Sequence, residues 1–294
     1  MTNLPFFTGP EHQPFTAGPA DGPGVLLLHG FMGTPAELRH LGDTLANHGF
    51  RVSAPLLPGF GSDIHNIGTT TRQHWHTAAA DHYHGLNTYN PQRIIVGYSL
   101  GAALAISLAT QRYHAGAPPD GIVLIAPFWR MPGWMHYAFQ LTLPFKGAFR
   151  PFQRADFSDP RLRDMFNKMA PELDLDDPEV QSRLRQDIQI PLSLLGEIVY
   201  VGRDAFRAAR RWSRPTLVIQ GHADPLVQPK YTHRLLRRLP PTTPYYELQG
   251  GHDIVQPTAP QRDQTARAVL SFLRQLGAAP QPAFATGRAL AAHR

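Results

Sequence analysis

A serine between two glycines is the residue of this sequence that is best placed for covalent chemistry. Ser99 lies at the centre of the segment GYSLG (97–101), which fits the pattern G-x-S-x-G. An apolar stretch precedes the pattern and an alanine-rich stretch follows it, which predicts a sharp turn from a strand into a helix. Side chains two residues away on either side would collide at such a turn, and glycine avoids both collisions. We therefore expect an exposed, nucleophilic Ser99 hydroxyl; the alternative is an ordinary glycine-flanked turn.

A serine hydroxyl is a weak nucleophile, so it needs a base that takes its proton and an acid that orients the base. His252 follows two glycines directly after the last expected strand, and Asp224 lies in the loop after the strand before it. Loops at the carboxyl ends of parallel strands can meet at one edge of a sheet. We therefore predict Ser99 as nucleophile, His252 as base and Asp224 as acid. Asp253 and Asp204 are alternative acids, although Asp253 is expected to point away from the ring of its neighbour.

Acyl transfer also needs N–H groups aimed at the developing oxyanion, each worth about 2.7–4 kcal/mol. The segment HGFMG (29–33) follows the first expected strand, where such a donor loop belongs. We predict an oxyanion hole made of the backbone N–H groups of Phe31 and Leu100. His29 is expected to brace the loop through hydrogen bonds and not to transfer a proton.

Residues for several other chemistries are missing. The sequence has no cysteine, which excludes disulfides, thiolate metal sites and a cysteine nucleophile. No phosphate-binding loop or dinucleotide fingerprint matches anywhere in it, and no cofactor is predicted. Four histidines crowd one expected helix, but they lack the four-residue spacing that helical zinc ligands favour. We therefore expect no metal site at His74, His76, His82 and His84.

The composition is that of a soluble, folded protein. The chain has 294 residues, of which 42% are hydrophobic and 17% charged, so it can bury one sizeable core and is not a long disordered polymer. No window approaches the roughly eighteen consecutive apolar residues that a membrane span needs. The first residues contain no positively charged region followed by an apolar run, so no signal peptide is predicted and a cytoplasmic location is expected.

A net charge of +6 arises from 28 Lys and Arg residues against 22 Asp and Glu residues. A nucleic-acid-binding protein would usually gather such charge in a run or stripe. The densest arginine groups instead recur at helical spacings between apolar residues, at 207, 210, 211 and 214 and at 234, 237 and 238. We interpret them as solvated helix faces, and we expect neither a nucleic-acid partner nor stable membrane insertion.

Strand and helix patterns alternate along most of the chain. Apolar runs predict strands over 25–28, 51–54, 93–96, 122–126, 216–220 and 245–248, and helical patterns cover 34–48, 71–86, 101–111, 231–239 and 259–276. Such alternation is typical of α/β proteins, in which a mostly parallel sheet is flanked by helices.

This alternation fails between residues 128 and 212. The stretch 131–153 is rich in aromatic residues and is broken by proline. We predict that 128–212 is an inserted helical lid over the carboxyl edge of the sheet, where open α/β folds bind ligands. Residues 1–127 and 213–276 then form the catalytic core. The last segment, 277–294, is rich in alanine, proline and glycine and is expected to be frayed.

At these residues the chain resembles the α/β-hydrolase superfamily, and within it the small bacterial carboxylesterases and monoacylglycerol lipases. The resemblance is carried by VLLLHGFMGTPAELRHLGDTLANHGFRVSAPLLPGFG (25–61), VGYSLGAALAISLA (96–109), VIQGHADPLV (218–227) and GGHD (250–253). It implies a Ser99 nucleophile, a His252 base, an Asp224 acid and a lid between the sixth and seventh strands of the superfamily's sheet. Two features depart from the family: 128–212 matches no familiar lid, and Ala102 stands where many relatives carry a second glycine.

The resemblance implies a serine carboxylester hydrolase that needs no cofactor. We expect small-molecule esters with short or medium apolar acyl groups, including monoacylglycerol-like ones, because the expected lid offers apolar surface. Its residues are Phe128, Trp129, Met131, Trp134, Met135, Tyr137, Phe139, Leu141, Leu143 and Phe145. Carbon–carbon bond hydrolases and perhydrolases use the same fold and the same three residues and stay open as alternatives, as does a non-catalytic binding protein. Epoxide and haloalkane hydrolases carry an aspartate where this chain has Ser99.

Overall fold

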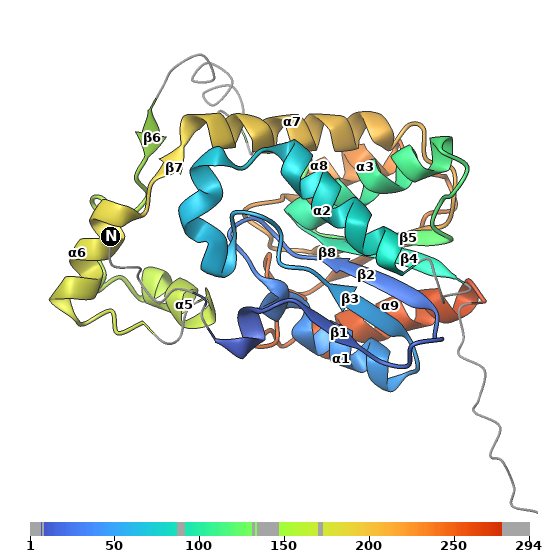
Figure 1. The fold of residues 1–294 in the computed structure, drawn as a ribbon, viewed down its shortest axis with the longest axis horizontal. Coiled ribbons are helices and arrows are strands. Elements are labelled where there is room, and N and C mark those ends of the chain that lie inside the picture. Colours follow the sequence, from blue (N-terminus) through green and yellow to red (C-terminus); the bar gives the residue numbers. More distant parts are fainter. Residues whose placement is uncertain are drawn as a thin grey trace, which may run out of the picture.

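The computed structural model describes residues 7, 9–86, 92–130, 133, 147–169 and 173–277. A seven-stranded sheet runs through it in the order β1-β3-β2-β4-β5-β8-β9 (Figure 1). The strands are β1 (Phe15–Ala17), β2 (Gly24–Leu28), β3 (Arg51–Ala54), β4 (Arg93–Tyr98), β5 (Gly121–Ile125), β8 (Thr216–Gly221) and β9 (Tyr245–Leu248). Neighbouring strands pair in parallel, except that β1 pairs antiparallel with β3. The predicted α/β class with a mostly parallel sheet is confirmed.

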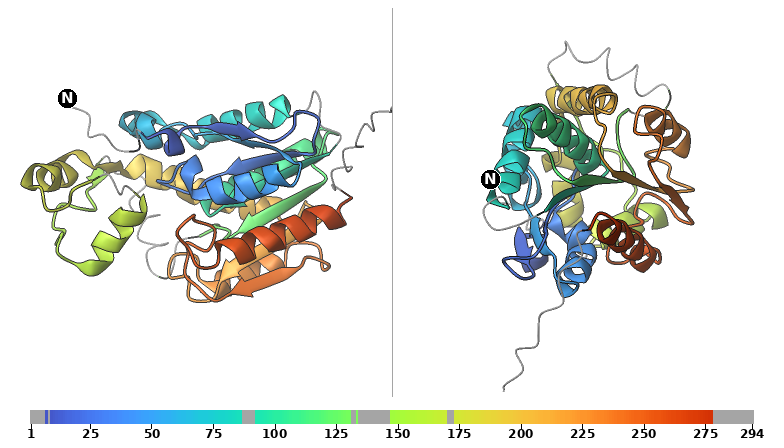
Figure 2. Two further views of the ribbon diagram at one scale, coloured as in Figure 1. Left: turned by 90° about the horizontal axis from the view of Figure 1, so that it is seen from below. Right: turned by 90° about the vertical axis from the view of Figure 1, so that its right-hand side faces the viewer.

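Helices cover both faces of this sheet (Figure 2). One face packs against α1 (Arg39–Asn47) and α9 (Arg262–Gln275), and the other against α2 (Arg72–Gly85), α3 (Leu100–His114), α7 (Leu192–Ala208) and α8 (Pro229–Leu236). The central strands β2 and β5 are buried at every residue, whereas the edge strand β9 is partly exposed. A parallel strand covered on both faces is apolar throughout, which explains why the central strands are recognisable as continuous apolar runs.

The predicted elements agree with the structure to within a few residues at their ends. The strands β3 and β9 have the predicted bounds. The strand β4 continues past its predicted end at Val96 to Tyr98, so that Ser99 follows the strand directly. The edge strand β1 and the 3-10 helices η1 (Pro10–His12) and η3 (Gly61–Thr69) were not predicted. Such short or tightly wound segments leave no clear hydrophobic period in the sequence.

The helix α7 belongs to the helical layer over the sheet, although its residues fall within the segment expected to form a lid. Leu194, Ile198 and Val201 are buried in the same apolar cluster as the residues of α3. A Cβ on Gly202 would lie 2.5 Å from the carbonyl oxygen of Trp129, so glycine allows the chain that leaves β5 to pack directly on this helix. The part of the expected lid that forms α7 therefore packs as a core helix.

The other described parts of the insertion lie beyond one end of the sheet (Figure 1). They are the antiparallel strands β6 (Ala148–Phe149) and β7 (Ile190–Pro191) and the helices α5 (Pro160–Met169) and α6 (Pro178–Asp187). These helices have a small apolar cluster of their own, which includes Phe157, Phe166 and Leu184 and which Phe7 joins. The strand β7 packs near η3, which follows β3, so the insertion adjoins the carboxyl edge of the parallel strands.

Several residues expected to give the lid an apolar surface lie outside the described residues, as does most of the expected tail. They are Met131, Trp134, Met135, Tyr137, Phe139, Leu141, Leu143 and Phe145, and residues 278–294 of the tail. Phe128 and Trp129 are described, and Phe128 is buried in the core cluster. In the described part of the chain, no helix combines the length and the apolar character that crossing a bilayer requires.

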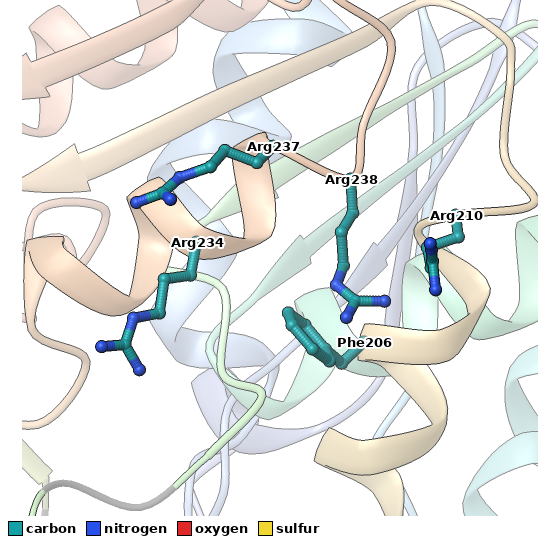
Figure 3. A pocket seen from close by; sticks show the side chains of 5 residues that line it. All are labelled: Phe206, Arg210, Arg234, Arg237 and Arg238. Atoms are coloured by element: carbon teal, nitrogen blue, oxygen red, sulfur yellow. The ribbon is translucent and has the colours of Figure 1, made fainter.

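The arginines expected on solvated helix faces differ in their surroundings. Arg210, Arg234 and Arg237 are exposed, whereas the guanidinium carbon of Arg238 lies 3.6 Å from the centre of the Phe206 ring. These five residues line an open hollow of about 500 Å³ beside the C-terminal ends of α7 and α8 (Figure 3). None of the three predicted catalytic side chains lines it, so this hollow is separate from the proposed chemistry.

We expect Ile198→Ala on α7 to lower the free energy of unfolding by about 2–5 kcal/mol, because it leaves a cavity in the core shared with α3. Urea unfolding followed by circular dichroism measures this loss. Ser193→Ala, at an exposed position of the same helix, is the control and should change the free energy of unfolding by less than about 0.5 kcal/mol. An Ile198→Ala protein as stable as the wild type would show that α7 is not part of the cooperative core.

Candidate active site

Ser99 connects β4 to α3 in a strained backbone conformation. Its φ of 54° and ψ of −114° lie outside the regions that residues with side chains ordinarily occupy. The Ser99 N–H donates to the carbonyl oxygen of Ile125 at 2.9 Å. A Cβ on Gly97 would lie 2.2 Å from the carbonyl oxygen of Gly101, and a Cβ on Gly101 would lie 2.0 Å from that of Leu28. Close backbone contacts therefore require glycine at both positions of the pattern.

The side chains of Ser99, His252 and Asp224 meet at the carboxyl edge of the sheet. The Nε2 atom of His252 lies 3.0 Å from Ser99 Oγ, and its Nδ1 atom lies 2.7 Å from Asp224 Oδ2. With its proton on Nδ1, the ring donates to the carboxylate and can accept the serine proton on Nε2. The Asp224 side chain is 0% exposed and that of His252 is 16% exposed. The carboxylate is thus shielded from water, while the imidazole remains accessible.

Neighbouring N–H groups hold the Asp224 carboxylate in place. Its Oδ1 atom accepts from the backbone N–H groups of Leu226 and Val227 at 2.9 and 2.8 Å, and its Oδ2 atom accepts from Gln220 Nε2 at 2.9 Å. The buried Gln220 side chain is itself held by the Thr232 hydroxyl, which donates to its Oε1 atom at 2.6 Å. These donors compensate the cost of burying the carboxylate and fix its orientation toward the imidazole.

Other residues weighed as site candidates have different partners. Asp204, an alternative acid, lies on α7 and forms ion pairs with Arg72 and Arg207 at 3.9 and 3.6 Å. His74, one of the clustered histidines, accepts the backbone N–H of Thr71 at 3.2 Å. Among the residues that the structure describes, no group of three His, Cys, Asp or Glu side chains is arranged to hold a metal ion.

His29 braces the loop that follows β2. Its Nδ1 atom lies 2.9 Å from the carbonyl oxygen of Gly30, and its Nε2 atom accepts the backbone N–H of Leu57 at 3.0 Å. These partners place the ring proton on Nδ1. Burial lowers the pKa of His29 to about 4, so the ring is neutral near pH 7 and can act as an acceptor. The contacts are those of the bracing residue that the sequence predicts.

The segments that carry the predicted oxyanion donors adjoin Ser99. A Cβ on Gly30 would lie 3.4 Å from the Cβ of Ser99, so the loop passes directly against the serine. Phe31 comes next in this loop, and its ring packs edge-on against Phe60 with 5.7 Å between the ring centres. Leu100 is the first residue of α3, where backbone N–H groups have no acceptor within the helix and the helix dipole favours negative charge.

The sequence patterns missed a partly buried carboxyl beside this loop. The Oε2 atom of Glu37 accepts the backbone N–H of Gly30 at 2.9 Å, and its Oε1 atom accepts from Gln256 Nε2 at 3.3 Å. Gln256 lies in the loop that carries His252. Tyr98 was also missed, and its hydroxyl donates to the carbonyl oxygen of His252 at 3.0 Å. These side chains tie the histidine loop to the segments around the serine.

The local sequence around Glu37 suggests a different role for it. Thr34 and Glu37 have the spacing of a capping box, in which both side chains close the start of a helix. Thr34 does cap η2 (Pro35–Leu38) by accepting the N–H of Ala36 at 3.3 Å, but Glu37 reaches Gly30 instead of the N-cap. The sequence gives a clearer signal for Gln220. It is a polar residue near the end of a buried apolar strand, and such a residue needs a hydrogen-bond partner.

Comparisons with known proteins agree with this fold. The family model for serine aminopeptidase, S33, matches residues 23–257. A thermostable monoacylglycerol lipase from Bacillus sp. (strain H-257) is 36% identical over 106 residues, which make up 36% of this chain and 41% of that relative. A carboxylesterase from Bacillus subtilis (strain 168) is 24% identical over 90% of this chain and 97% of its own length. A structure reported with the metagenome-derived lipolytic enzymes LipS and LipT has a TM-score of 0.69 at 22% identity, covering 90% of this chain and 98% of its own.

The low pKa of His29 predicts a specific pH dependence of stability. The folded chain holds this ring neutral down to about pH 4, whereas the ordinary pKa is 6.5, so the unfolded chain takes up the proton first as the pH falls. The stabilising contribution is therefore complete above pH 6.5 and is lost as the pH falls through about 4. This shift corresponds to about 3 kcal/mol.

His29→Gln removes this titration. We expect the variant to be less stable than the wild type near pH 7 by about 1–3 kcal/mol, because the glutamine amide does not reproduce the opposed contacts of the ring to the Gly30 carbonyl oxygen and the Leu57 N–H. The difference should shrink as the pH falls from 6.5 toward 4, which urea unfolding at several pH values measures. The exposed His84→Gln serves as a control with wild-type pH dependence. Parallel stability curves for the wild type and His29→Gln would contradict this account.

Proposed function

The chain belongs to the serine aminopeptidase S33 family of α/β hydrolases, and we propose that it hydrolyses carboxylic esters through a covalent acyl-enzyme on Ser99. One observation carries the proposal: His252 Nε2 lies 3.0 Å from Ser99 Oγ, and a buried carboxylate orients the other side of the ring. Nucleophile, base and orienting acid within hydrogen-bond reach are the arrangement that activates a serine. The monoacylglycerol lipase and the carboxylesterase among the relatives support ester hydrolysis.

In the first half-reaction, Ser99 Oγ attacks the ester carbonyl carbon while His252 Nε2 takes the serine proton. The carbonyl oxygen becomes an oxyanion and accepts hydrogen bonds from the backbone N–H groups of Phe31 and Leu100. Asp224 holds the imidazole in the required tautomer and stabilises its charged form. The tetrahedral intermediate then collapses, and the alcohol leaves with the proton from His252.

Water completes the cycle in the second half-reaction. His252 takes a proton from a water molecule, whose oxygen attacks the carbonyl carbon of the acyl-enzyme. A second oxyanion forms in the same place, the bond to Ser99 Oγ breaks, and this oxygen regains its proton from His252. The acid product leaves, and no redox step or cofactor enters this scheme.

The proposed substrates are esters with short or medium acyl groups, including monoacylglycerol-like ones. Phe31 and Met32 follow β2, and Leu56 follows β3; all three are apolar and only partly buried against the core. Because parallel strands end at the same edge, these side chains offer apolar surface on the side of Ser99. Such surface suits the acyl chain of an ester, whereas a free peptide N-terminus needs a negatively charged recognition group.

Replacing Ser99 by alanine removes the attacking oxygen. We expect a loss of turnover of about four orders of magnitude or more with an unchanged fold, because the remaining donors and binding surface supply only a small part of catalysis. The measurement is kcat on p-nitrophenyl esters, with circular dichroism as the check of folding. A fluorophosphonate should label the wild type and not the variant. Esterase activity close to that of the wild type in Ser99→Ala would reject the nucleophile.

A substrate panel separates ester hydrolysis from related chemistry. We expect p-nitrophenyl esters of short or medium acyl chains to be hydrolysed with higher kcat/KM than long-chain esters, aminoacyl p-nitroanilides or ring-cleavage dienones. The preference for an ester follows from its better leaving group and from the apolar surface near the serine. Faster cleavage of the p-nitroanilides would favour a peptidase, and faster cleavage of the dienones would favour a carbon–carbon bond hydrolase.

A further inference from the structure

We propose that Glu37 is a positioning residue for ester hydrolysis, whose ionised carboxylate joins the oxyanion loop (29–33) to the histidine loop (250–257) in their reactive arrangement. This inference rests on the proposed function, because it assigns a role within the same reaction. Glu37 is not expected to touch the substrate. It acts through Gly30 and Gln256, which each donate an N–H to one of its two oxygens.

The two contacts of Glu37 link segments that are far apart in the sequence. Gly30 directly precedes Phe31, whose N–H is a proposed oxyanion donor, so the bond from the Gly30 N–H at 2.9 Å fixes the peptide next to that donor. Gln256 lies four residues after His252, and its Nε2 atom donates to the other carboxylate oxygen at 3.3 Å. One side chain thus sets the distance between the groups that bind the oxyanion and the base that moves the proton.

The fold provides a close-fitting place for this carboxyl. A Cβ on Gly33 would lie only 2.0 Å from Glu37 Oε2, and a Cβ on Gly30 would lie 3.3 Å from the same atom. Both glycines of the segment HGFMG therefore make room for the carboxylate. Met32, between them, has a positive φ of 59°, so the loop bends tightly around Glu37. A helix-capping carboxylate would need no such enclosure.

The charges around Glu37 connect it to the chemistry. His252, from the histidine loop, is near enough to favour the charged form of Glu37 when its ring carries a proton, and the buried Tyr98 hydroxyl, from β4, also interacts with the Glu37 charge. Asp224 and Asp253 also act on Tyr98 and add further negative charge. Burial raises the pKa of Glu37 to about 7. Its carboxylate is thus ionised above neutrality, where it stabilises the imidazolium that forms when His252 accepts the serine proton.

Protonation changes what Glu37 can do. The ionised carboxylate accepts N–H groups on both oxygens, whereas the neutral acid carries a hydroxyl on one of them and loses one of these contacts unless the partner turns. Protonation of Glu37 therefore weakens the link to the histidine loop and also removes the negative charge that favours the imidazolium. The acid limb of kcat should therefore include the ionisation of Glu37.

The first test compares the pH dependence of kcat for the wild type and Glu37→Gln. Glutamine has the same shape and can keep a contact to Gly30, but it has neither charge nor titration. We expect kcat above neutrality to fall roughly 10- to 100-fold with little change in KM, because displaced reacting groups cost rates of this order. The acid limb should become less steep because the Glu37 ionisation is lost, and the kcat values of the two proteins should converge at low pH.

Two further variants separate positioning from folding. Gln256→Ala breaks the link but leaves the carboxyl in place, so it should lower kcat and keep the steeper acid limb of the wild type. Glu197→Gln is the matched control: Glu197, on α7, accepts the backbone N–H of Arg72, on α2, at 2.9 Å through Oε2, and this variant should keep the wild-type pH profile. Thermal unfolding identifies any variant that loses its fold. If Glu37 had a purely structural role, Glu37→Gln would change the thermal stability but leave the shape of the pH profile of kcat unchanged.

A second readout does not depend on ester turnover. The rate of Ser99 labelling by a fluorophosphonate should follow the same pH profiles and be slower in Glu37→Gln. Infrared difference spectra should show a carboxylic acid band that titrates near pH 7 in the wild type and is absent from the variant. If Glu37→Gln were labelled at the wild-type rate at every pH, the role of Glu37 would be overturned, but the proposed function would stand. Absence of labelling in the wild type itself would overturn the proposed function.

Discussion

The geometry of the site depends on a close approach of backbone segments that only glycine permits. At Gly101 the first turn of α3 lies against the carbonyl oxygen of Leu28, where a Cβ would come within 2.0 Å. The loop after β2 begins at the next residue, so this contact sets the distance between that loop and Ser99. A second contact of the same kind joins β8 to the histidine loop, because a Cβ on Gly221 would lie 1.9 Å from the carbonyl oxygen of Gly251. The strained Ser99 backbone is held between these fixed segments.

Two carboxyls in the site, one buried and one partly buried, have different surroundings. Asp224 accepts three N–H groups besides the imidazole, so its negative charge is well compensated. Glu37 accepts two N–H groups, and burial raises its pKa to about 7. The carboxyl at position 37 is thus suited to a proton exchange near neutrality, whereas the one at position 224 is held by more donors.

The fold and the meeting of Ser99, Asp224 and His252 at one sheet edge could be predicted from the sequence because each signal is local. Ser99, Asp224 and His252 each follow an apolar run, and parallel strands bring such ends to one edge. Glu37 and Gln220 could not be assigned in this way, because their meaning depends on burial and on partners distant in the chain. Glu37 also fits a common helix-start pattern. The apolar residues of α7 recur at helical spacing in the sequence. The irregular aromatic stretch before them gives no pattern from which the end of the insertion could be predicted.

His29 and Glu37 lie on opposite sides of Gly30 in sequence and shift their proton affinities in opposite directions. Burial lowers the pKa of the base from 6.5 to about 4 and raises that of the acid from 4.5 to about 7. When the chain folds in weakly acidic solution, the histidine releases a proton and the glutamate takes one up. These two groups therefore exchange almost no net protons with the solvent on folding between about pH 4.5 and 6.5, and their opposite contributions to the pH dependence of the free energy of unfolding nearly cancel there.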